Sequence, residues 1–189
     1  MVDIKSKFLL ILGAWILLSI GAVAHTGPHS AREYLVKAAF VYNFARFVEW
    51  PSERSQEPDG PITLSIFGKD PFGDSLESIR GKRVKGREME IRRVDGIENL
   101  QRCHILFISE SEKENLSRIL MKVSDWPVLT VSDMDGFAHR GGMINFRTVE
   151  KKIRFEINLN AAERTGLKIS SKLLKLAKIV KEEQAGAEP

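Results

Sequence analysis

The hydrophobic pattern of the chain predicts strands and helices in alternation. A run of β-branched and aromatic residues at 62–67 predicts a strand. Continuous apolar runs at 103–109 and 127–132 predict two more, of the kind buried on both faces. Segments 70–79 and 111–123, which follow two of these strands, are predicted helices. Uniformly apolar strands that alternate with helices indicate a largely parallel sheet covered on both faces.

The remaining segments complete a single domain. Residues 33–50 are predicted to form a helix that Pro51 stops, followed by a polar loop at 52–61. Further predictions are a strand at 89–94, a hairpin of strands at 143–147 and 153–158, a short helix at 161–165, and a helix at 170–180 that Ser170 caps. Because the hairpin adds antiparallel strands, we expect an α/β fold: a single three-layer α/β/α domain with a mixed, largely parallel sheet and a C-terminal β-hairpin followed by helices.

The first residues have the three parts of a secretory signal. Lys5 and Lys7 precede an uncharged, mostly apolar run at 8–24, which ends in the small residues Ala22, Val23 and Ala24. An uncleaved membrane anchor is the alternative, but the glycines and the serine within the run weaken it. We therefore expect a signal peptide at 1–24 that is cleaved after Ala24, an exported soluble domain at 25–180, and a flexible charged tail at 181–189.

Charge and cysteine content narrow the classes of function. The 29 basic and 25 acidic residues are mixed along the sequence, so the chain lacks the basic face expected of a nucleic-acid-binding protein. A single cysteine, Cys103, excludes an internal disulfide. Because it begins an apolar run, we interpret it as a buried thiol, with a redox role as the alternative. His104 lies in the same run and is interpreted as a core residue.

Common catalytic and cofactor motifs are absent from the sequence. It has no Walker loop, GxGxxG, GxSxG, HExxH or paired cysteines, so we expect no enzymatic activity, no cofactor and no metal site. Loops at the carboxyl ends of strands, where open α/β sheets bind ligands, are candidate positions for a small molecule, with helix capping and turn geometry as the structural alternatives. The candidate ligand residues are Asp70, Phe72, Gly73, Ser109, Ser132, Asp133, His139, Arg140, Gly141 and Gly142.

The helix predicted at 33–50 has apolar residues around most of its circumference. Such a surface is explained either by deep burial under another helix or by contact with a second chain, in a dimer or with a partner. Both explanations stay open from the sequence. The residues that we assign to the candidate interface are Tyr42, Arg46, Glu49 and Trp50.

Seven segments, spread in order over the mature chain, carry a further signal. They are 37–51 (KAAFVYNFARFVEWP), 70–73 (DPFG), 103–109 (CHILFIS), 129–133 (LTVSD), 141–146 (GGMINF), 153–158 (IRFEIN) and 170–174 (SSKLL). In order and spacing, these segments resemble the YfiR family of periplasmic proteins.

The resemblance implies a non-enzymatic periplasmic regulator with an α/β fold and a tendency to form homodimers. The family's named member binds the periplasmic sensor region of an inner-membrane diguanylate cyclase and represses it. Release of that repression raises cyclic di-GMP and favours biofilm growth. We expect the same function here, with a periplasmic small-molecule-binding module that modulates a sensor kinase or an envelope system as the alternative. Some members carry disulfide-forming cysteine pairs, and this chain departs from them because it has Cys103 alone.

Overall fold

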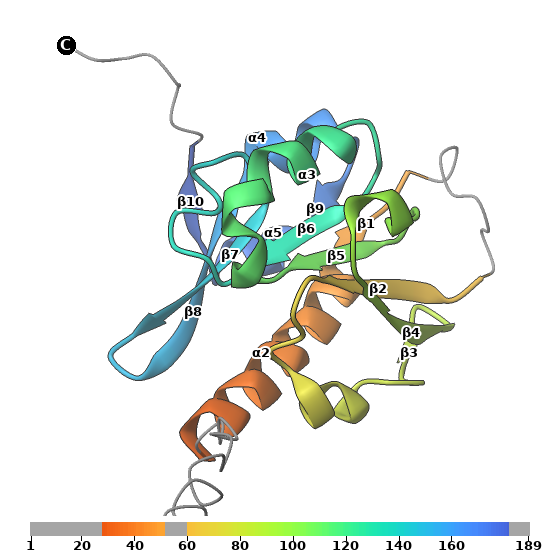
Figure 1. The fold of residues 1–189 in the computed structure, drawn as a ribbon. Coiled ribbons are helices and arrows are strands. Elements are labelled where there is room, and N and C mark those ends of the chain that lie inside the picture. Colours follow the sequence, from red (N-terminus) through yellow and green to blue (C-terminus); the bar gives the residue numbers. More distant parts are fainter. Residues whose placement is uncertain (1–27, 52–59, 182–189) are drawn as a thin grey trace, which may run out of the picture.

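One eight-stranded sheet organises the chain, in the strand order β10-β8-β7-β6-β5-β2-β4-β3 (Figure 1). The structure is a computed structural model that describes residues 28–51 and 60–181, so the predicted signal peptide and nearly all of the predicted tail lie outside the described residues. The strands of the sheet are β2 (Ile62–Phe67), β3 (Arg83–Val84), β4 (Arg87–Val94), β5 (Ile105–Ile108), β6 (Leu129–Ser132), β7 (Ile144–Val149), β8 (Lys152–Asn158) and β10 (Lys178–Val180).

Parallel pairing dominates this sheet. Strands β4, β2, β5, β6 and β7 are parallel neighbours, and β10 runs parallel to β8. The antiparallel pairs are β7 with β8 and β3 with β4. The predicted mixed, largely parallel sheet is therefore confirmed. The predicted hairpin is formed by β7 and β8, and its turn places Glu150 and Lys151 at positive φ (50° and 61°).

Helices lie on both sides of the sheet. Helix α2 (Pro28–Phe47) runs along one side, and α3 (Leu116–Lys122) lies on the other (Figure 1). Short helices and 3-10 helices fill the connections. They are η2 (Gly73–Ser78), η3 (Ile97–Asn99), η4 (Glu110–Asn115), α4 (Leu159–Arg164) and α5 (Ser171–Leu174).

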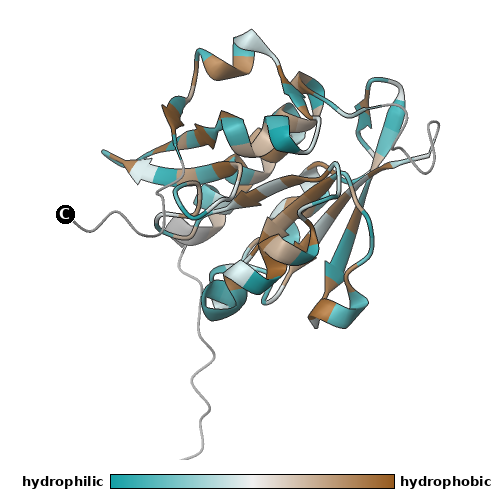
Figure 2. Cartoon of the chain, turned by 90° about the horizontal axis from the view of Figure 1, so that it is seen from above, coloured by the Kyte–Doolittle hydropathy of each residue, from teal (hydrophilic) through white to brown (hydrophobic). Residues whose placement is uncertain are grey.

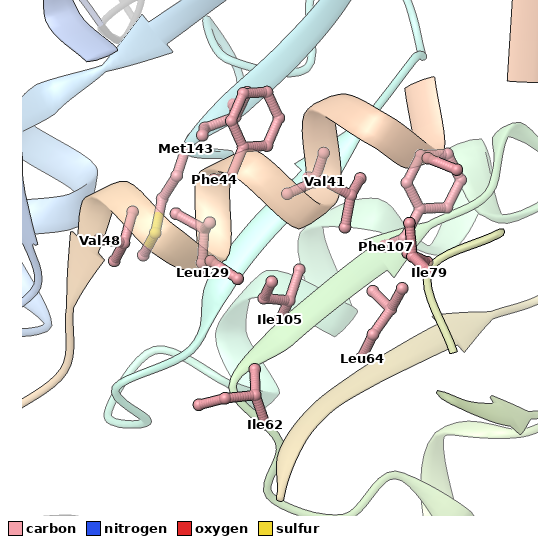
Figure 3. Close-up of a cluster of buried hydrophobic side chains, with 14 of the residues drawn as sticks. Val41, Phe44, Val48, Ile62, Leu64, Ile79, Ile105, Phe107, Leu129 and Met143 are labelled. Carbon is pink, nitrogen blue, oxygen red and sulfur yellow. The ribbon is translucent and has the colours of Figure 1, made fainter. Parts of the chain in front are cut away.

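Alternate residues of the central strands enter two separate cores. On β5, Ile105 and Phe107 belong to the larger core, which packs against α2 and is drawn in Figure 3. Leu106 and Ile108 point the other way, into the core that packs against α3. Hydrophobic residues predominate along the central strands (Figure 2), and the polar residues among them are the buried Thr63, Ser65, Thr130 and Ser132. Each fully buried apolar side chain of this size contributes about 1.5–3 kcal/mol, so both faces of the sheet must be covered.

The helix predicted at 33–50 begins earlier and ends earlier in the structure. Helix α2 ends at Phe47, and β1 (Val48–Glu49) then pairs antiparallel with β9 (Lys168–Ile169). The N–H of Ser170 donates to the carbonyl oxygen of Phe47 (2.9 Å), and Val48 is fully buried. Strand pairing and burial of Val48 therefore replace the last helical turn, and the residue before Pro51 is itself biased away from helical geometry.

The prediction of a helix at 170–180 is wrong for the second half of that segment. Ser170 does cap a helix, because its Oγ accepts a hydrogen bond from the N–H of Lys172 (3.3 Å), but α5 ends at Leu174. Residues Lys178–Val180 form β10, an edge strand whose Val180 is buried. Ile179 and Val180 are β-branched, and pairing with β8 prevails over the local helical pattern.

The other differences are smaller. The segment predicted as a helix at 70–79 is the tighter 3-10 helix η2, and the helix predicted at 111–123 divides into η4 and α3. Strand β3 has only two residues, and the sequence did not indicate it. Helix α4 begins two residues before the predicted position, with Asn158 as its cap, because Asn158 Oδ1 accepts from the N–H of Ala161 (3.0 Å).

Candidate functional site

The candidate ligand residues divide between one edge of the sheet and a loop that leaves that edge. Asp70 and Phe72 follow β2, Ser109 follows β5 and Asp133 follows β6, so these residues lie at the carboxyl edge of parallel strands. The loop 133–143 connects β6 to β7. Because these two strands are parallel, the loop must return to the opposite edge of the sheet. It carries His139, Arg140, Gly141 and Gly142, which therefore do not form one site with Asp70. Gly73 lies beside Asp70 at the start of η2, and Ser132 is the last residue of β6.

Polar side chains at the carboxyl edge are engaged in holding their own loops. Asp70 Oδ1 accepts from the N–H of Phe72 (2.7 Å), and its Oδ2 accepts from Nε of Arg93 (2.7 Å). Ser109 Oγ accepts from the N–H of Ser111 at the start of η4 (3.5 Å). Capping and turn closure account for these contacts, as the structural alternative to a ligand site expects.

Asp133 belongs to a buried charged cluster with the first helix. Its Oδ2 lies 2.7 Å from Nζ of Lys37, and the hydroxyl of Tyr34 donates to the same oxygen (2.9 Å). Nζ of Lys37 is also 2.7 Å from Oε1 of Glu33, and the Lys37 side chain is only 5% exposed. A buried ammonium is tolerated only when it is paired and hydrogen-bonded. The cluster therefore ties α2 to the loop after β6.

Tyr34 is the uncharged member of this cluster. Burial, followed by the negative charge of Asp133, raises the pKa of the Tyr34 hydroxyl. It therefore stays protonated and acts as a hydrogen-bond donor to the carboxylate. The sequence identified Asp133 but neither Tyr34 nor Lys37, because these residues lie about a hundred positions away in the chain (separations of 99 and 96).

Buried polar side chains hold the loop 133–143 against the sheet. Ser132 Oγ donates to the carbonyl oxygen of Ile108 (2.7 Å) and accepts from the N–H of Met134 (3.1 Å). Nδ2 of Asn145 donates to the carbonyl oxygen of Met134 (2.8 Å), and Nδ2 of Asn158 donates to that of Ala138 (2.9 Å). Backbone N–H and carbonyl groups in this loop have no neighbouring strand to bond to, and these side chains supply their hydrogen-bond partners.

The paired glycines of this loop have two different structural causes. Gly141 has a φ of 96°, a geometry that favours glycine. A Cβ on Gly142 would lie 2.1 Å from Cε1 of Phe137, so this glycine is required by the close approach of the aromatic ring. His139 is half-buried beside them. Arg140 is exposed, and its Nη2 donates to the carbonyl oxygen of Lys113 in η4 (3.3 Å).

The residues assigned to the candidate interface on the first helix have two kinds of environment. Tyr42 and Trp50 are half-buried and bonded within the chain: the Tyr42 hydroxyl donates to the carbonyl oxygen of Arg83 (3.0 Å), and Nε1 of Trp50 donates to that of His104 (3.0 Å). Arg46 and Glu49 are exposed. Most of the apolar residues of α2 lie in the core, which supports burial as the explanation for much of its circumference.

An exposed stripe nevertheless remains on α2. Leu35 is 48% exposed, and Ala39 and Arg46 are exposed on the same side of the helix, since residues separated by three or four positions share a face. Tyr42 completes this stripe as a half-buried member. We call these four positions the α2 stripe. Val36, beside it, is 40% exposed.

Cys103 and His104 directly precede β5 and have strongly shifted pKa values. Burial raises the pKa of the Cys103 thiol to about 11, so the thiol stays protonated near neutral pH. Burial and the nearby positive charge of Arg87 lower the pKa of His104 to about 4, so its ring is neutral. Nδ1 of His104 accepts from the N–H of Thr63 (3.1 Å), and Nη2 of Arg87 lies 3.0 Å from its Nε2. Both residues are half-buried, whereas the sequence predicts a buried thiol and a core histidine.

No catalytic constellation is assembled from these groups. Among residues 28–51 and 60–181, no cluster of three or more His, Cys, Asp or Glu side chains is arranged to hold a metal ion. Nucleophilic catalysis needs a nucleophile, a base and an orienting group in contact, and Cys103 is a protonated thiol beside Ser65. Over the same described residues, no helix is long and apolar enough to cross a membrane.

The sequence of this domain matches a known protein family. The YfiR/HmsC-like family matches residues 34–178, which is nearly the whole described domain. It is a regulatory, non-catalytic and generally periplasmic family associated with cyclic di-GMP signalling. The resemblance seen in the sequence motifs is confirmed, and the chain belongs to the YfiR/HmsC-like family.

Proposed function

We propose that this chain is a periplasmic regulator that binds the periplasmic sensor region of an inner-membrane diguanylate cyclase and restrains it, so that cyclic di-GMP output falls. The family match over residues 34–178 carries this proposal. Regulation by binding requires a stable domain with an accessible surface and no catalytic chemistry. The α2 stripe supplies the surface that we assign to the partner, together with Glu49 of β1.

The shape of the α2 stripe suits a protein partner. It joins apolar residues (Leu35 and Ala39) to an aromatic ring and a guanidinium group (Tyr42 and Arg46), and interface centres are enriched in such residues. The guanidinium of Arg46 lies 6.0 Å from the centre of the Tyr42 ring, so the two side chains present one joint surface. We assign the same stripe to homodimer formation in the absence of the partner.

Genetic and biochemical measurements together test the proposal. Deleting the gene should raise intracellular cyclic di-GMP, measured with a fluorescent reporter, and complementation should lower it again. The same deletion in a strain that also lacks the partner cyclase should have no effect. Cross-linking in the intact envelope should recover that cyclase with the protein. Unchanged cyclic di-GMP after deletion, with no inner-membrane protein recovered, would refute the proposal.

A small-molecule-binding module that modulates a sensor kinase or an envelope system is the second candidate. A cavity between α3 and α4, lined by Arg140 and Gly141 among others, favours it. The two candidates differ in their genetic dependence. If this module acts on a kinase, the phenotype of the deletion persists in a strain without the cyclase and disappears in a strain without the kinase.

A further inference from the structure

A cavity of about 560 Å³ lies between α3, α4 and the loop 133–143. Small-molecule sites in proteins commonly enclose about 300–1,000 Å³, so the space suits a compact ligand. One side of α3, the start of β6, the end of the loop and the last turn of α4 supply its walls. The cavity is distant in the chain from α2 and includes none of its residues.

Charged side chains of both signs line the cavity. Arg140 reaches it from the loop and Arg164 from the last turn of α4, while Asp125 contributes a carboxylate. Two guanidinium groups and one carboxylate are thus among the groups that line the cavity. The bond from Nη2 of Arg140 to the carbonyl oxygen of Lys113 (3.3 Å) holds that side chain beside η4, which directly precedes α3. Guanidinium groups are suited to carboxylates and phosphates because their N–H groups bind two oxygens at once.

Apolar side chains form part of the cavity wall. Leu120 and Met143 provide aliphatic contacts, and Met143 is 4% exposed. Thr130, which is 2% exposed, also lines the cavity, and its Oγ1 accepts from the N–H of Met143 (3.0 Å). A polar group and an apolar wall in one cavity fix the orientation of a ligand with two kinds of surface.

We propose that this cavity binds a small organic anion. Its carboxylate or phosphate group contacts Arg140 and Arg164, and its apolar part packs against Leu120 and Met143. The proposal goes beyond the proposed function, because it concerns a ligand site separate from the α2 stripe. Such a ligand changes partner binding only if its affinity differs between the free and the partner-bound protein.

Calorimetric titration of the mature protein with four probes tests this inference. Phenyl phosphate and benzoate combine an anionic group with a ring, inorganic phosphate has only the charge, and benzyl alcohol has only the ring. We expect at least one of the two aromatic anions to bind at least about tenfold more tightly than inorganic phosphate and benzyl alcohol, because charge and apolar contact both contribute. Because the titration uses purified protein alone, its result is independent of whether the proposed cyclase regulation holds.

Single variants separate the site from a general loss of structure. Arg140→Gln and Arg164→Gln should each weaken binding of the aromatic anion by about tenfold. Asp125→Asn should tighten it, since a repelling charge is removed, and no unfolding effect produces tighter binding. Arg118→Gln, on α3 but outside the cavity, is the matched control and should change nothing. Absence of binding for both aromatic anions, or equal weakening by Arg118→Gln, overturns the inference.

Discussion

Lys37 is a charged residue in the interior, and its neighbours explain why it is there. Its ammonium group lies 2.7 Å from carboxylate oxygens of both Glu33 and Asp133, and its Nζ lies 4.4 Å from the centre of the Tyr34 ring. All of these partners are placed at one point between α2 and the loop after β6. A charge in this position contributes little net stability compared with an apolar residue, but it permits only one arrangement of helix and loop.

Removing one partner of this cluster should be costly. Lys37→Met leaves Asp133 largely buried with only the Tyr34 hydroxyl, so we expect the free energy of unfolding to fall by about 3 kcal/mol. The double variant Lys37→Met with Asp133→Asn should be more stable than Lys37→Met, because it leaves no uncompensated charge. Urea denaturation measures both. Arg80→Ala, which breaks an exposed pair with Glu77, is the control and should leave the midpoint unchanged.

His104 should make stability depend on pH in the acidic range. Its pKa is about 4 in the fold and 6.5 in the reference state, so the unfolded chain takes up a proton first as the pH falls. The contribution of His104 is complete above pH 6.5 and is lost as the pH falls toward 4. His104→Asn retains an acceptor for the N–H of Thr63 but does not titrate. Unfolding free energies measured from pH 4 to 6.5 should therefore fall less steeply for this variant; equal slopes would contradict the prediction.

At the scale of elements, sequence reasoning succeeded where the signal is local and failed where it depends on a distant partner. The apolar runs of β2, β5 and β6 predicted the central strands because strands buried on both faces need no alternation. Strands β1 and β10 have two and three residues, and each exists because it pairs with a strand outside its own local segment, β1 with β9 and β10 with β8. Local helical periodicity therefore predicted helices over both segments, at 33–50 and 170–180.

Only part of the candidate site could be predicted from the sequence. The strand-end rule correctly placed Asp70 and Asp133 at the carboxyl edge, but it placed the whole loop 133–143 there as well. The loop in fact returns along the sheet because β7 is parallel to β6. Only the three-dimensional structure brings Arg140 together with Arg164 of α4 in one cavity. Neither the residue type nor the spacing in the sequence indicates that these two arginines, which belong to different elements, lie close together.

The loop 133–143 should be sensitive to the size of residue 142. In Gly142→Ala, the new Cβ meets the ring of Phe137, which is fully buried and cannot move aside easily. Overpacking of this kind costs about 1–3 kcal/mol of unfolding free energy, measurable by denaturant titration. Introducing the same change into a Phe137→Leu background should cost clearly less, because the ring is gone. An equal penalty in both backgrounds would mean that the backbone of Gly142, and not its contact with Phe137, is responsible.

At the scale of the whole molecule, the α2 stripe and the α3–α4 cavity are two separate surfaces. The α2 stripe lies on the side of the larger core, whereas the cavity is lined by residues of both cores: Val123 belongs to the core under α3, and Met143 and Ala161 belong to the larger core. A regulator of this family needs a partner surface, and a separate ligand site adds a means of control without competing for that surface. The sheet is buried on both sides, so it forms a rigid layer that connects the elements of both surfaces.

The α2 stripe supplies the last prediction, which concerns association of the whole molecule. Leu35→Asp places a charge at a position that is 48% exposed, so the fold should lose no more than about 0.5 kcal/mol of stability. If the stripe contacts the cyclase, this variant should raise cyclic di-GMP to the level of the deletion strain and weaken cross-linking to the partner. Arg46→Ala should act in the same direction with a smaller effect, because it removes one contact without adding a charge. Met121→Asp is the matched control: Met121 is 76% exposed on α3, on the other side of the sheet, and its substitution should leave repression intact. Light scattering of the purified variants measures the homodimer separately, and a Leu35→Asp protein that is folded, dimeric and fully repressing would place the contact surface elsewhere.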